Sequence, residues 1–150
     1  MRISDYLSEN TIFLDLNAEN KIDAFRTMVA TMADRDVIAE PKTFLDEVIA
    51  REALEPTCIG REVALPHTRT RCVERPIIAF ARTSQGIPFT QALSDRVRLI
   101  FMMGTPKDEA TLYLQILARL CRLLRRPDFR DRLLSASTPQ DILQLFTDFD

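Results

Sequence analysis

The chain contains a single histidine, His67, and the residues around it favour chemistry. It follows Pro66, which biases Leu65 toward an extended backbone, so the end of a rigid strand should present the imidazole in a loop. A neutral imidazole is nucleophilic near pH 7, and cations nearby disfavour its protonation and can hold phosphoryl oxygens. The pattern therefore predicts a phosphoryl acceptor. The candidate cations are Arg51, from the preceding helix, and Arg61, Arg69, Arg71 and Arg75.

Other interpretations of these residues stay open. The arginines also fit a solvated face on which they pair with Glu62 and Glu74. Cys58 lies nine residues before His67 and could form a Cys–His nucleophile pair, although an idle thiol is the simpler interpretation. One histidine, with no carboxylate or cysteine at ligand spacing, predicts that the chain holds no metal.

Composition excludes several classes of protein. With 150 residues, 46% apolar and 28% charged, the chain fits one soluble globular domain spanning 1–150. It has three glycines and neither a GxxxxGK[ST] nor a GxGxxG pattern, so we expect no nucleotide cofactor. The net charge is −2, although seventeen of the twenty basic residues are arginine, and it predicts no nucleic-acid partner. No signal sequence or apolar run near the ~20 residues of a membrane span occurs, which predicts a cytoplasmic protein without membrane insertion.

Strand-like and helical segments are interspersed along the chain, which predicts an α/β domain. Gly86 and Pro88 predict a turn between the third and fourth strands. Thr138 to Asp141 resembles a capping box. The expected strands are Thr11–Leu16, Glu62–Leu65, Pro76–Arg82 and Val97–Met103. The expected helices are 18–33 (capped by Asn17), 41–54, 108–124, 127–134 and a last one from Pro139.

The sequence resembles the enzyme IIA domains of the phosphotransferase system, fructose/mannitol type. Their signature is an apolar–Gly pair, two residues, then apolar–Ala–apolar–Pro–His. Here it reads Ile59-Gly60 and Val63-Ala64-Leu65-Pro66-His67, preceded by Arg51-Glu52. Arg51 stands sixteen residues before His67, as does the family arginine that contacts the phosphoryl group. The resemblance covers nearly the whole chain, and both ends are most similar to the nitrogen-regulatory branch, the PtsN-type proteins.

The resemblance implies a compact domain with a mixed β-sheet flanked by helices. It implies that His67 accepts a phosphoryl group from an HPr-like phosphocarrier, which would dock on apolar surface. Ile59, Val63 and Leu65 are candidates for that surface unless they belong to the core. In the nitrogen-regulatory branch the phosphorylation state tunes binding to regulatory target proteins, whereas sugar-transport members pass the group to a IIB domain. We favour the regulatory role, and leave the transport role and a homodimer open.

Three positions depart from the family pattern. Thr68 follows the histidine where Gly, Ala or Cys is usual, and its hydroxyl can bind a phosphoryl oxygen or crowd a donor. Tyr113 stands where many members carry a second histidine; it can donate a hydrogen bond but cannot take a proton near pH 7. Only Gly60 remains of a glycine-rich turn. These departures keep open a binding module that has the fold but no longer transfers phosphate. An unrelated hydrolase or metal protein is a weaker alternative, because no second catalytic base or set of metal ligands is evident.

Overall fold

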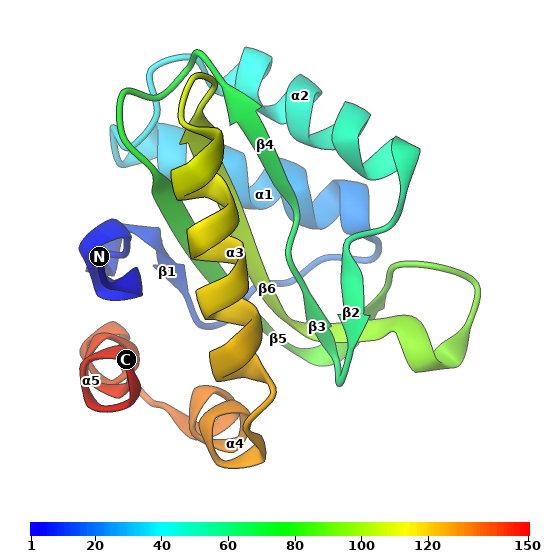
Figure 1. The fold of residues 1–150 in the computed structure, drawn as a ribbon. Coiled ribbons are helices and arrows are strands. Elements are labelled where there is room, and N and C mark those ends of the chain that lie inside the picture. Colours follow the sequence, from blue (N-terminus) through cyan, green and yellow to red (C-terminus); the bar gives the residue numbers. More distant parts are fainter.

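A mixed six-stranded sheet forms the centre of the computed structural model, which describes all 150 residues (Figure 1). Five strands neighbour one another in the order β1-β5-β6-β3-β2, and β4 also pairs with β6. The β5–β6 and β2–β3 pairs are antiparallel, and the others are parallel. The strands are β1 (Ile12–Phe13), β2 (Cys58–Gly60), β3 (Val63–Ala64), β4 (His67–Thr70), β5 (Ile77–Pro88) and β6 (Arg96–Pro106).

Helices cover both faces of the sheet, with α1 and α2 on one face and α3, α4 and α5 on the other. Short 3-10 turns occur at 3–6, 9–11 and 93–95. This arrangement confirms the predicted α/β class and mixed sheet. The helices are α1 (Lys21–Asp34), α2 (Pro41–Leu54), α3 (Ala110–Leu124), α4 (Pro127–Ser135) and α5 (Pro139–Phe149).

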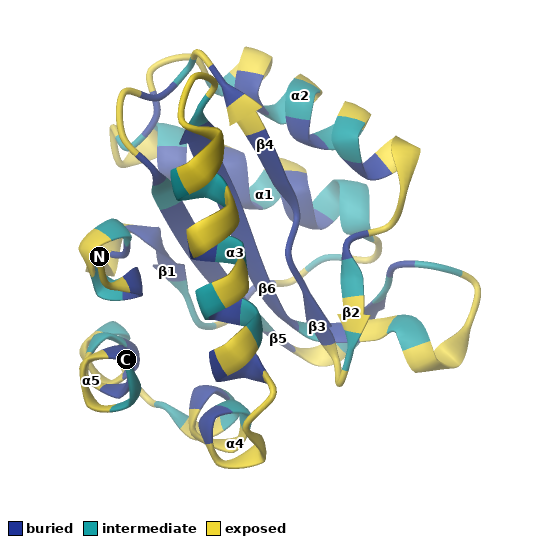
Figure 2. Cartoon of the chain, in the orientation of Figure 1, coloured by how far each residue is buried: buried dark blue, intermediate teal, exposed yellow.

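Alternate residues of the two central strands face opposite helical layers, so the sheet separates two apolar cores. The Phe80 and Phe101 rings lie 4.7 Å apart between centroids, tilted by 31°, and belong to the core under α3 to α5. Ala79, Ile100 and their neighbours face Phe25, Phe44 and other side chains of α1 and α2. Figure 2 shows the resulting dark stripe of buried residues along β5 and β6. Burial on both faces explains why these strands read as nearly continuous apolar runs.

The predicted turn at Gly86 and Pro88 is wrong, because β5 continues through both residues to pair with β6. The strand register shifts between Arg82 and Ile87, and Gly86 adopts a φ of 74° inside this irregular stretch. A bulge of this kind needs a residue that tolerates positive φ, and glycine does so at little cost. The glycine therefore bends a long strand without ending it.

Two boundaries near the amino terminus also differ from the prediction. Asn20, and not Asn17, caps α1, since its side chain accepts a hydrogen bond from the Asp23 N–H at 2.9 Å. The strand expected at Thr11–Leu16 shortens to Ile12–Phe13. The capping box at the start of α5 is confirmed, with Thr138 and Asp141 bonding each other's backbone N–H groups. No helix has the length and apolarity needed to cross a membrane.

Candidate functional site

Two short strands, β3 and β4, pair in parallel with the same edge of β6, and Pro66 lies between them. This interruption of the pairing determines where His67 lies. β3 pairs with Leu99 and Ile100, and β4 pairs from Met103 onward. Proline lacks an N–H and so interrupts the ladder, but its carbonyl accepts from the Met103 N–H at 2.9 Å and pairing resumes at once. His67 is therefore the first residue of β4, and the expectation that it lies in a loop is wrong.

The His67 imidazole is held by one backbone hydrogen bond. Its Nδ1 lies 2.6 Å from the Leu65 carbonyl oxygen, so Nδ1 carries the proton and donates it. Nε2 has no hydrogen-bond partner within the protein and is not enclosed. Burial lowers the pKa of His67 from its ordinary value of 6.5, and the Arg51 charge lowers it further, while the Leu65 bond and Glu52 oppose both. The ring is thus a neutral imidazole with its free lone pair on Nε2. Burial lowers the pKa of His67 more than the charge of Arg51 does, although the sequence predicted that arginines would keep the ring neutral.

A cavity of about 450 Å³ opens beside His67, between α2, β4 and the first turns of α3. Arg51 and Arg69 both line it. Arg51 lies in the last turn of α2 and donates to the Glu55 carbonyl at 3.1 Å, which steadies its guanidinium group. Arg69 is exposed on β4, two residues after the histidine. The site therefore joins one neutral imidazole to two guanidinium groups, an arrangement suited to an anionic group on the imidazole.

Thr68 and Tyr113 line the same cavity, so the structure brings together all four predicted site residues. The Tyr113 ring lies 5.5 Å from the imidazole, between centroids, and is tilted 51° to it. The Arg69 guanidinium carbon lies 5.9 Å from the Tyr113 ring centroid. The Thr68 hydroxyl donates to the Arg69 carbonyl at 3.3 Å. Leu114, which is 61% exposed, completes the outer wall.

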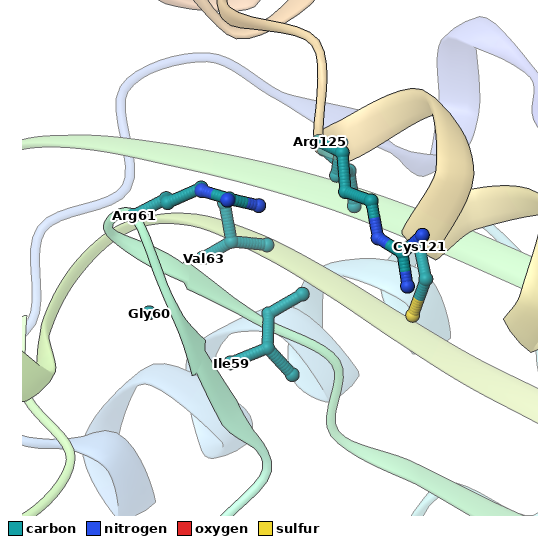
Figure 3. Close-up of a pocket in the computed structure, with 7 residues that line it drawn as sticks. Ile59, Gly60, Arg61, Val63, Cys121 and Arg125 are labelled. Atoms are coloured by element: carbon teal, nitrogen blue, oxygen red, sulfur yellow. The ribbon is translucent and has the colours of Figure 1, made fainter.

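Several residues expected near His67 lie elsewhere. Arg61 stands at the tip of the β2–β3 hairpin, where it lines a separate cavity of about 180 Å³ with Cys121 and Arg125 of the α3 end (Figure 3). Arg75 donates to the Asp5 carbonyl, far along the chain. The other residues absent from the His67 cavity are Arg71, Cys58 and the exposed Ile59, which lines the same separate cavity as Arg61, together with Val63 and Leu65, which belong to the core.

One buried carboxylate near the site, that of Glu52, was not predicted from the sequence. Glu52 is only 2% exposed and accepts hydrogen bonds from the Thr57 N–H at 2.9 Å and the Thr57 hydroxyl at 2.5 Å. Lys21 of α1 pairs with it at 3.3 Å. Its place beside Arg51 was the only signal, because sequence does not show which glutamates are buried. No three His, Cys, Asp or Glu side chains cluster in a way that could hold a metal ion.

The fold is that of solved IIA domains. It matches nitrogen regulatory protein IIA-Ntr from Neisseria meningitidis with a TM-score of 0.87, at 24% identity over 96% of this chain and 98% of the other. It also matches the Escherichia coli mannitol IIA in its complex with phosphorylated IIB, with a TM-score of 0.79, at 23% identity over 95% and 97% of the chains. At these identities the likeness shows the shared fold.

Residues 5–149 match the family model described as phosphoenolpyruvate-dependent sugar phosphotransferase system, EIIA 2, and the chain belongs to this family of phosphocarrier domains. A fructose-specific EIIA component from Haloferax volcanii is 32% identical over 87% of this chain and 85% of its own length. A nitrogen regulatory protein from Bradyrhizobium diazoefficiens is 30% identical over 95% and 92%. The Bacillus subtilis fructose-specific EIIABC component is 27% identical over the whole chain, which spans about a quarter (24%) of that relative.

Proposed function

We propose that Nε2 of His67 accepts a phosphoryl group from a phosphorylated HPr-like carrier. The observation that carries this proposal is the hydrogen bond from Nδ1 to the Leu65 carbonyl, which leaves the Nε2 lone pair free beside two guanidinium groups. The lone pair forms the new P–N bond while the P–N bond to the donor breaks, and the electron pair of that bond returns to the donor nitrogen. The proton on Nδ1 stays in its hydrogen bond to Leu65 throughout.

Arg51 and Arg69 bind the phosphoryl oxygens in this proposal. A transferring phosphoryl group carries its charge on three equatorial oxygens, so fixed cations around it stabilise the transition state. Arg51 is anchored at the end of α2, and Arg69 approaches from β4. Tyr113 and Thr68 line the same cavity, and their hydroxyls are neutral donors that can bind a phosphoryl oxygen, Thr68 by giving up its bond to the Arg69 carbonyl.

We also propose that phosphorylation of His67 changes the affinity of the domain for regulatory target proteins, as in the nitrogen-regulatory branch. Relatives of both the regulatory and the sugar-transport kind are similar to this chain, so onward transfer to a IIB domain is the second candidate. Phosphorylated wild-type protein mixed with a fructose-type IIB domain separates the two. Retention of the phosphoryl group on His67 supports the regulatory role, whereas its movement to the IIB domain supports transport.

Phosphoryl uptake itself is tested by intact mass. The protein is mixed with phosphoenolpyruvate, enzyme I and an HPr-like carrier, beside His67→Ala. One acid-labile phosphoryl group on the wild type and none on the variant is the expected result. If neither a sugar-type nor a nitrogen-type carrier phosphorylates the wild type, the protein is a binding module, and Thr68→Gly then tests whether the threonine blocks the donor.

A further inference from the structure

The Glu52 carboxylate is hydrogen-bonded to Thr57 in the loop that follows α2. Glu52 does not line the His67 cavity. Both donor groups of Thr57, its N–H and its hydroxyl, donate to this one carboxylate. Lys21 supplies a third donor from α1. A buried carboxylate is costly unless it is paired and fully bonded, and here three donors meet that need. The carboxylate therefore fixes Thr57 firmly in place.

A continuous set of hydrogen bonds runs from this carboxylate to the imidazole. The Thr57 carbonyl accepts from the Leu65 N–H at 3.0 Å. The Leu65 carbonyl in turn accepts from His67 Nδ1 at 2.6 Å. Leu65 is thus fixed on its N–H side by Thr57 and directs its carbonyl at the ring. No side chain orients the ring through Nδ1, so the position of Leu65 decides which nitrogen carries the proton.

We propose that Glu52 is a positioning residue for His67: it fixes Thr57, and Thr57 fixes Leu65, so that Nδ1 is held by the Leu65 carbonyl and Nε2 faces the cavity. This inference rests on the proposed function of His67 for its catalytic consequence, but the orientation of the ring stands on the hydrogen bonds alone. Misplacement of a reacting group by a fraction of an ångström to an ångström costs up to roughly a hundredfold in rate.

The charge of Glu52 adds a second effect. When Nε2 bonds to phosphorus while Nδ1 keeps its proton, the ring carries positive charge, and a carboxylate nearby stabilises it. Lys21 opposes this effect because it neutralises Glu52 from outside. The other charged or titratable groups that face the imidazole are Arg51 from α2, Arg69 from β4 and Tyr113 from α3. Changes at Glu52 and at Lys21 should therefore shift the pKa of His67 in opposite directions.

The test is a comparison of Glu52→Gln with the wild type by nitrogen-detected NMR of the imidazole, which is unambiguous because the chain has one histidine. The wild type should show neutral His67 with its proton on Nδ1. In Glu52→Gln we expect a mixture of both tautomers, a lower His67 pKa and phosphoryl uptake slowed roughly ten- to a hundredfold. Lys21→Met should raise the His67 pKa.

The matched control is Glu47→Gln. Glu47 lies on the same helix and also binds a threonine hydroxyl, that of Thr70 at 3.2 Å, but it does not lead to the imidazole. It should keep the wild-type tautomer and uptake rate. If Glu52→Gln does not fold, Thr57→Val removes one of the two latching bonds and Thr57→Ser restores it, so the pair carries the same test.

Glu52→Gln with lower thermal stability but an unchanged tautomer and His67 pKa would show that Glu52 is structural only, and would overturn the inference. Failure of the proposed function gives a different result. In that case the wild type takes up no phosphoryl group from any carrier, while the tautomer of His67 still responds to Glu52→Gln.

Discussion

The two guanidinium groups beside His67 are held differently, and this difference predicts unequal roles. Arg51 is anchored to the Glu55 carbonyl, whereas Arg69 is exposed and lies against Tyr113. Loss of a preorganised donor to a transition-state oxygen costs roughly a hundredfold or more in rate. We expect Arg51→Ala to slow phosphoryl uptake by that amount, and Arg69→Ala to slow it less. Initial rates of uptake by intact mass check both.

Arg61→Ala is the control for these arginines. Arg61 was also named from the sequence as a candidate cation for His67, and its substitution removes the same charge. It lines the separate cavity beside Cys121, however (Figure 3). Its uptake rate should equal that of the wild type. If Arg61→Ala slowed phosphoryl uptake as much as Arg51→Ala, the arginines would act only through the overall charge of the domain. Arg51 would then not bind the phosphoryl oxygens directly.

Tyr113 is predicted to protect the phosphorylated histidine through its hydroxyl. Tyr113→Phe keeps the ring near the imidazole and removes one donor, a hydrogen bond worth about 1 kcal/mol. The phosphoryl group on His67 should then be lost roughly five times faster, as followed by intact mass at fixed pH. Tyr6→Phe is the control, because Arg75 covers Tyr6 at 5.8 Å much as Arg69 covers Tyr113. Equal half-lives for Tyr113→Phe and the wild type would assign the tyrosine a packing role alone.

At this scale the sequence predicted side chains but not backbone partners. His67, Arg51, Thr68 and Tyr113 could be named from their types and spacing, and they do meet at one cavity. The Leu65 carbonyl could not be named, because every residue carries a carbonyl and only the path of the chain selects one. The sequence predicted five arginines near His67, but only Arg51 and Arg69 line its cavity, for a related reason. Residues six before and eight after His67 leave its neighbourhood as soon as the hairpin and the strand turn away.

At the scale of elements, the position of α2 over β6 decides where Arg51 stands. Phe44 of α2 packs directly on Gly104 of β6, and a Cβ added at Gly104 would lie 2.7 Å from the Phe44 ring. Gly104 pairs with Thr68 in the sheet, so the same contact fixes the spacing between helix and strand beside the site. Sequence revealed α2 and β6 but not this contact, which depends on tertiary packing.

Gly104→Ala should therefore destabilise the protein by about 1–3 kcal/mol, the usual cost of overpacking a core. Phe44→Leu in the same chain should relieve part of this loss, and urea unfolding of both single variants and the double variant measures the coupling. Gly60→Ala is the comparison. Its Cβ would meet nothing within 4 Å, but its φ is 82°, so it should cost about 1–2 kcal/mol of backbone strain. Phe44→Leu should not relieve that strain. If the losses in free energy of unfolding simply add, both for Gly104→Ala with Phe44→Leu and for Gly60→Ala with Phe44→Leu, the contact between Phe44 and Gly104 is refuted.

Proline and glycine show how far element boundaries could be predicted. Pro66 was expected to end a strand, and β3 does end at Ala64, but pairing with β6 resumes at His67, directly after Leu65 and Pro66. Gly86 was expected to end β5, and it forms an irregular stretch within the strand instead. Both residues were recognised as breaks in local structure. Whether the chain rejoins the ladder after a break depends on β6, a strand distant in sequence, and local propensity contains no information on that.

For the whole molecule, the single histidine links the site to global stability. Burial is the main cause that lowers the pKa of His67, so the folded protein holds this ring neutral at a pH where the unfolded chain would protonate it. Between the lowered pKa and the ordinary value of 6.5, the unfolded state binds more protons than the folded state. The free energy of unfolding must therefore fall as the pH falls through this window, by at most about 1.4 kcal/mol per pH unit from this group. Below the folded pKa the loss from His67 is complete.

Urea unfolding between pH 8 and pH 5, for the wild type beside His67→Gln, measures this linkage. The glutamine does not titrate, so the difference in stability between the two proteins should be constant above about pH 7.5 and should then shift in favour of the variant as the pH falls. Carboxylates titrate equally in both proteins and cancel in the difference. A difference that stays flat across the whole range would mean that His67 has the same pKa in the folded and unfolded chain. The imidazole would then be solvated, and no longer the buried neutral nucleophile on which phosphoryl acceptance depends.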